Sequence, residues 1–210
     1  MKEVKVFALN GQLGYGYPLS SYHKGMSMNP DMVGADAGSS DGGPAFLGTG
    51  TALTGRTAVK RDLEFVLPDV IKRKIPFVIG SAGTAGGEPH INIVTEIIRE
   101  IAAEKNLHFK MAIIHSEVPK EYIKKKLREG KVHPLGDNVP VLTEEIIDRT
   151  VRVVGQMGVT PFIKALETGV DVIVGGRACD TAIFACLPIK RGFDPALAFH
   201  AAKVMECGAY

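Results

Sequence analysis

The sequence lacks tryptophan, long apolar runs and a disulfide pattern. Its three cysteines, Cys179, Cys186 and Cys207, are odd in number and fit a reducing compartment better than a disulfide framework. No run reaches the roughly 18 apolar residues of a membrane-spanning helix. The first residues, MKEVKVFALNGQLGYG, lack the apolar stretch of a signal peptide. We therefore expect a cytoplasmic protein with no membrane partner.

The chain also lacks an excess of either charge. It has 25 basic and 23 acidic residues, a formal net charge of +2. A protein that binds nucleic acid by neutralising phosphates needs a clear basic excess, so we expect no nucleic-acid partner. Hydrophobic residues make up 45% of the 210 residues, which suits a globular chain. At this length, residues 1–210 are expected to form a single α/β domain with its own core.

Short apolar segments predict the strands of that domain. Four are clear and the fifth is weaker: Val4–Leu9, Ile75–Ile79, Phe109–Ile114, Val170–Val174 and Met32–Ala35. Three of them are apolar at nearly every position, as in parallel strands covered on both faces. Helical apolar stripes lie between them, within residues 63–71, 94–102 and 146–154. The sequence thus predicts an α/β fold, an open, mostly parallel sheet with helices on both faces.

Several local signals predict where helices begin or break. Thr160 and Asp194 each precede a proline, a pattern typical of a helix N-cap. Pro68 interrupts the first stripe and predicts a kink or a new start there. The region Gly11–Gly55 shows no clear pattern. A loop of that length is either functional or contains elements that local patterns do not reveal.

Small and polar residues follow each predicted strand. The segments are Asn10–Gly16, Asp36–Pro44, Gly80–Gly87, His115–Glu117 and Gly175–Asp180. Ligands of open α/β sheets bind outside the carboxyl ends of the strands. We therefore expect these segments to meet at one rim and to bind a small anionic molecule.

The loop Gly80–Gly87 is the best candidate for the anion itself. It joins a buried strand to a predicted helix, where free backbone N–H groups favour negative charge. Ser81, Gly83 and Thr84 would then contact the anion, although a tight turn without a ligand explains the glycines equally well. The spacing matches neither the dinucleotide fingerprint nor a Walker A loop. A dinucleotide-dependent oxidoreductase is therefore disfavoured.

The segment after Met32–Ala35 carries two carboxylates and two hydroxyls. Asp36 and Asp41 could divide acid and base roles between them, with Ser39 and Ser40 contacting substrate. The two carboxylates could also share a divalent cation. Alternatively, these side chains cap their own backbone turn. No histidine or cysteine lies at a zinc-ligand spacing, so no metal site is assigned.

The segment Gly175–Asp180 places a guanidinium at a strand end. Arg177 suits a carboxylate or phosphate ligand, or else pairs with Asp36, Asp41 or Asp180 within the fold. Asp180 could act in catalysis or, with Thr181, cap the following helix.

Two further side chains could take part in catalysis. His115 ends a strand among polar residues, where a general base is expected, although a structural histidine fits too. Cys179 could be a nucleophile if a helix N-terminus stabilised its thiolate.

Four motifs together resemble the acyclic terpene utilisation (AtuA-like) family. They are Asp36–Gly48, Pro76–Gly83, Gly158–Phe162 and Val172–Asp180. The resemblance implies a role in the breakdown of branched acids, whose chemistry uses coenzyme A esters. Members are usually longer, so it also implies the N-terminal part of a longer protein or one subunit of a split protein.

Two hypotheses follow. The first is an enzyme acting on a small carboxylate or acyl-CoA-like substrate, by hydrolysis, hydration or dehydration, or isomerisation. Asp36, Asp41, His115 and Asp180 would move protons, and no cofactor is identified beyond a coenzyme A ester as substrate. The second is a non-catalytic subunit or scaffold that docks a partner chain. Either way we expect a homo-oligomer or a C-terminal partner chain.

Overall fold

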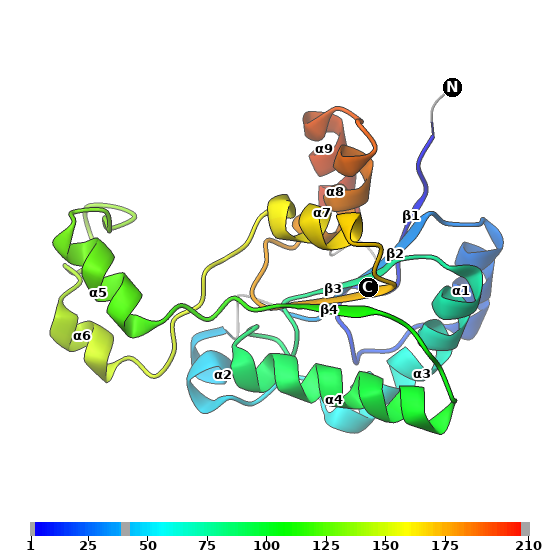
Figure 1. Cartoon of the computed structure of the whole chain (residues 1–210), viewed down its shortest axis with the longest axis horizontal. Coiled ribbons are helices and arrows are strands. Elements are labelled where there is room, and N and C mark those ends of the chain that lie inside the picture. The colour runs from blue at the N-terminus through cyan, green and yellow to red at the C-terminus, as the bar shows by residue number, and fades with distance from the viewer. Residues whose placement is uncertain (1–2, 39–42, 207–210) are drawn as a thin grey trace.

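The computed structural model describes residues 3–38 and 43–206 and shows an α/β architecture (Figure 1). Its strands are β1 (Val6–Ala8), β2 (Met32–Asp36), β3 (Phe77–Gly80), β4 (Met111–Ile114) and β5 (Val172–Gly175). All pairings are parallel, in the order β1-β2-β3-β5-β4. The predicted fold class and all five predicted strands are therefore confirmed.

Helices cover both faces of this sheet. They are α1 (Leu19–Ser27), α2 (Gly43–Thr49), α3 (Arg56–Arg73), α4 (Glu88–Glu104), α5 (Lys120–Arg128), α6 (Glu144–Arg149), α7 (Val159–Glu167), α8 (Ala182–Lys190) and α9 (Pro195–Glu206). One core joins α1, α3 and α4 to side chains such as Val33 and Phe77. A second core joins α7, α8 and α9 to the opposite face, including Val78 and Ile173. The central strands β2, β3 and β5 are buried on both sides because successive side chains alternate between these two cores, whereas the outer strands β1 and β4 are only partly buried.

The irregular region Gly11–Gly55 contains elements that the sequence patterns did not reveal. Helices α1 and α2 lie within it, before and after β2 along the chain.

Two helix predictions are corrected. Of the two outcomes predicted at Pro68, the new start is wrong, because α3 runs unbroken through this proline, with Leu63 and Leu67 fully buried. Helix α7 begins at Val159 with Gly158 at its N-cap and no side-chain cap, so Thr160 is not the cap.

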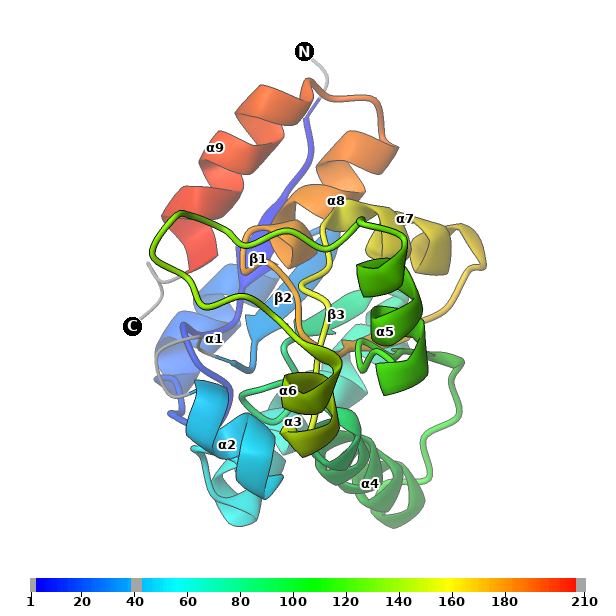
Figure 2. The same cartoon turned by 90° about the vertical axis from the view of Figure 1, so that its left-hand side faces the viewer.

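Helices α5 and α6 project from the rest of the molecule as an arm (Figures 1 and 2). Two antiparallel segments connect the arm to the sheet, with Glu117 bridged to Val154 and Val118 N–H donating to the carbonyl of Val153. Among the described residues, no helix is both long and apolar enough to span a membrane.

Candidate functional site

The carboxyl ends of the central strands meet at one edge, as the sequence predicted. Asp36 is the last residue of β2 and lies opposite Gly80, the last residue of β3. Its side chain is only 2% exposed, and its Oδ1 accepts a hydrogen bond from Gly38 N–H at 3.1 Å. Asp36 is thus a buried carboxyl group at the point where ligands of such sheets bind.

Three carboxylates gather around this point. Each of Asp36, Asp180 and Glu206 offers an oxygen, and these atoms lie within 4.8 Å of one another. They come from β2, from the segment after β5 and from the last turn of α9. Such a set of hard oxygen ligands could hold a divalent cation, or it could share protons.

Glu206 was missed by the sequence analysis, although a signal was present. Ala198, Ala202 and Glu206 are spaced four residues apart, and all three are buried. Residues at this spacing share one helix face. A glutamate on the apolar stripe of α9 was therefore the sign of a buried carboxylate. Glu206 also forms an ion pair with Lys203.

This crowding changes the protonation of the cluster. Burial, reinforced by the nearby Asp180 carboxylate, raises the pKa of Asp36 to about 8. Burial also raises the pKa of Asp180, with Glu206 adding to the shift and Arg177 opposing it. Asp36 is consequently a neutral acid at pH 7, able to donate a proton.

Arg177 pairs with Asp180 within the fold, which is one of the two alternatives that the sequence left open. Its Nη2 donates to Asp180 Oδ1 at 2.9 Å and to the carbonyl of Ala178 at 2.6 Å. Asp180 therefore orients the arginine and does not cap α8, whose N-cap Thr181 has no side-chain cap bond either. Among the described residues, Nε and Nη1 of Arg177 make no hydrogen bond, and both bonds of the guanidinium come from Nη2.

The loop Gly80–Gly87 is packed against the segment after β5. The Ser81 hydroxyl lies 3.2 Å from both the N–H and the carbonyl of Ala178, and Thr84 Oγ1 accepts from Leu53 N–H at 2.9 Å. Both residues are buried, and Gly83 has a positive φ of 60°. The structure thus brings Ser81 together with the Arg177 segment, with both hydroxyls already bonded inside the protein.

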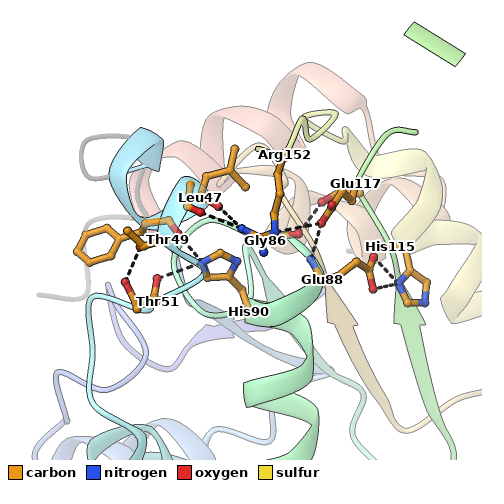
Figure 3. Close-up of polar contacts among 12 residues, drawn as sticks. Leu47, Thr49, Thr51, Gly86, Glu88, His90, His115, Glu117 and Arg152 are labelled. Carbon is orange, nitrogen blue, oxygen red and sulfur yellow. Dashed lines mark hydrogen bonds and ion pairs between the residues drawn. The ribbon is translucent and has the colours of Figure 1, made fainter. Parts of the chain in front are cut away.

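The side-chain carboxylate of Glu117 lies at the N-terminus of α4. Glu88 N–H donates to Glu117 Oε2 at 2.9 Å (Figure 3). This is the position where the sequence predicted an external anion. Glu117 belongs to the predicted polar segment His115–Glu117 but was not chosen as a site residue. It lies three residues after the end of β4, and local sequence does not tell which helix it faces.

His115 lies beside this helix terminus and does not contact the carboxylate cluster. Its Nδ1 is 2.8 Å from Glu88 Oε1 (Figure 3), and its side chain is 61% exposed. A carboxylate that holds Nδ1 leaves Nε2 as the ring nitrogen able to accept a proton. A shallow pocket of about 450 Å³ adjoins His115 and is also lined by Ser116, Gln156 and Met157.

Neighbouring side chains in the same view hold α2 against α4. Nε2 of the buried His90 lies 3.0 Å from the carbonyl oxygens of both Phe46 and Thr51 (Figure 3). Arg152 Nη1 donates to the carbonyls of Leu47 and Gly48. The His90 bonds thus connect α4 to α2 and the residues after it, and the Arg152 bonds connect the base of the arm to α2.

The remaining site predictions fall in two groups. Ser39, Ser40 and Asp41 lie outside the described residues. Cys179 has a free thiol whose sulfur is 3.3 Å from Thr181 Oγ1, at the start of α8. The helix N-terminus expected near this cysteine is therefore present.

Fold and site together define an α/β protein with a carboxylate-lined strand edge. A family model, the acyclic terpene utilisation family protein AtuA, matches residues 55–210. The chain therefore belongs to the AtuA family. The matched segment contains Arg177, Asp180 and Glu206, whereas Asp36 precedes it. No curated protein and no solved structure matches the chain.

Proposed function

We propose that this chain carries the acid–base centre of an enzyme that acts on a small carboxylate or acyl thioester in the breakdown of branched acids. Membership of a family for acyclic terpene utilisation supports the substrate class. The observation that carries the proposal is Asp36, a buried carboxyl group with a pKa of about 8 beside two other carboxylates.

In this proposal Asp36 donates a proton to the substrate and a neighbouring carboxylate receives one. A pKa close to the working pH lets one group both hold and release a proton. Hydrolysis, hydration or dehydration, and isomerisation next to a carbonyl group all require such transfers. Arg177 is the proposed contact for the anionic end, through Nε and Nη1. The predicted contacts from Ser39, Ser40 and Asp41 would complete the site.

The proposed test begins with a ligand. A thermal-shift screen with coenzyme A esters, dicarboxylates and divalent cations identifies compounds that bind the folded state. Turnover of a stabilising compound is then compared between the wild type and Asp36→Asn. Loss of a general acid lowers turnover about 10²-fold or more. The exposed Asp137→Asn serves as the matched control. Equal turnover in Asp36→Asn and the wild type would refute the role.

A second candidate function, docking of a partner chain, has support in the α5–α6 arm. Large apolar side chains are exposed there, namely Tyr122, Leu135, Val139, Val141, Ile146 and Val151. Exposed apolar patches of this kind often mark protein interfaces. Replacing Leu135 and Val141 with serine is expected to reduce the molar mass measured by light scattering if the arm joins two copies. An unchanged monomeric mass in both proteins would contradict self-association through the arm.

A further inference from the structure

A largely apolar groove lies along the free edge of the sheet. It has a volume of about 640 Å³, and its lining residues come mainly from β1, the end of α1 and α9. Figure 2 labels these three elements. Its walls include Val4, Val6, Met28, Leu197 and Met205. This volume falls within the range of roughly 300–1,000 Å³ found for small-molecule sites.

The groove leads toward the carboxylate cluster. Leu197 lines it near the start of α9, and Met205 lines it in the last turn. Glu206, the next residue, belongs to the cluster with Asp36. Successive residues on a helix point about 100° apart, so one turn of α9 presents Met205 to the groove and Glu206 to the acids.

The walls of the groove offer little to a charged ligand. Lys5 is the one charged residue among those that line it in the described chain, and its ammonium is 3.1 Å from Glu3. Apolar groups instead come from both faces of the sheet, with Val6 packed toward α8 and α9 and Phe7 toward α1. Displacing water from such walls favours an aliphatic guest.

We infer that this groove binds the aliphatic chain of the substrate, with the chain's polar end at the Asp36–Asp180–Glu206 cluster. The inference rests on the proposed function for the identity of the reacting end. It adds a separate binding surface, formed by β1, α1 and α9, that selects for chain length. A peptide strand paired to β1 is less favoured, because β1 offers the backbone of only three residues.

The test measures binding of straight-chain carboxylates from butanoate to decanoate by calorimetry. Each added methylene that enters the groove is expected to tighten binding about three- to fourfold. Ala201 lines the groove and is exposed, so Ala201→Trp fills the groove without disturbing the core. This variant should bind butanoate as the wild type does and lose the dependence on chain length. Ala196→Trp, an exposed position on α9 that does not line the groove, should keep it.

A second variant guards against misfolding of the first. Leu197→Glu places a charge in the groove and an acidic residue in the first turn of α9, where it suits the helix dipole. It should also abolish the dependence on chain length. Circular dichroism of each variant verifies the fold.

Two results would overturn the inference. One is binding that does not change with chain length in the wild type. The other is a change of molar mass in Ala201→Trp with no effect on acid binding, which identifies the groove as an interface between chains. The Asp36→Asn variant separates this inference from the proposed function. Its binding affinity should still rise with the length of the carboxylate, whether or not Asp36 acts in catalysis.

Discussion

At the residue scale, a buried acid governs how stability changes with pH. The folded chain holds Asp36 protonated up to about pH 8, whereas an unfolded aspartic acid ionises near pH 3.8. Between these values the unfolded state binds fewer protons than the folded state, so this residue lowers stability as the pH rises from about 4 to 8. The protein therefore keeps a destabilising group at the rim of its sheet, as functional sites often do.

Asp36→Asn is expected to relieve that penalty. An amide of similar shape cannot ionise, so the variant should be more stable than the wild type at pH 8, by roughly 1–4 kcal/mol. The difference should shrink toward pH 4, where the wild-type carboxyl is protonated in both states. Urea unfolding at both pH values measures it. A difference that does not vary with pH would contradict the raised pKa.

The backbone at Gly86 leaves no room for a side chain. Its φ is +70°, and a Cβ built there would lie 2.0 Å from the backbone nitrogen of Arg177. Gly86→Ala should therefore destabilise the fold by about 3 kcal/mol or more, because backbone must move. Gly136→Ala, with no atom within 4 Å of its Cβ, should change stability by about 0.5 kcal/mol or less. Thermal or urea unfolding of the pair checks both values, and similar losses at both positions would refute the contact.

At the scale of elements, α9 connects the groove to the carboxylate cluster. Its predicted start is confirmed, since Asp194 Oδ1 accepts from Leu197 N–H at 3.1 Å. The buried face of α9 packs on α8 through Ala198 and Ala202. This packing places Glu206 beside Asp36. The position of one catalytic candidate thus depends on how a whole helix packs.

Asp194→Ala should weaken this helix at its first turn. Loss of an N-cap side chain costs about 0.5–2 kcal/mol, measured as the free energy of unfolding in urea. Asp194→Ser keeps an acceptor at the cap and should recover most of the loss. A variant with serine that is as unstable as the one with alanine would show that the cap bond is not the cause.

At the scale of the whole molecule, the sheet ties the two halves of the chain together. β5 lies between β3 and β4, so a strand from the C-terminal half pairs with two strands that precede the arm. The arm itself has few buried side chains, with Lys124 and Ile147 the buried residues of its helices. The loop from 129 to 143 is almost entirely exposed.

Brief trypsin treatment is accordingly expected to cut first after Lys131, in that exposed loop. The fragments 1–131 and 132–210 should stay associated in size-exclusion chromatography, because β5 remains paired in the sheet. Denaturing gels identify the cut. Protection of Lys131 in the native protein would contradict an open arm and favour one covered by a partner.

Much of the fold could be predicted from sequence because its signals are local. Short apolar runs such as Ile75–Ile79 mark strands, and the polar segments that follow them identify the rim. Asp36, Arg177 and Asp180 were expected there for that reason. Local patterns were weaker in the region Gly11–Gly55, where α1 is short, buries only Tyr22 and Met26, and was missed.

The sequence by itself determined the alternation of strands and helices, and with it the edge at which polar side chains gather. Only the tertiary structure decided the order in which β5 enters the sheet, the pairing of Arg177 with Asp180, and the arrival of Glu206 beside Asp36. The reason is physical. Strand and helix signals depend on neighbours within a few residues, whereas these contacts depend on how distant, separately formed elements bury their apolar faces against one another.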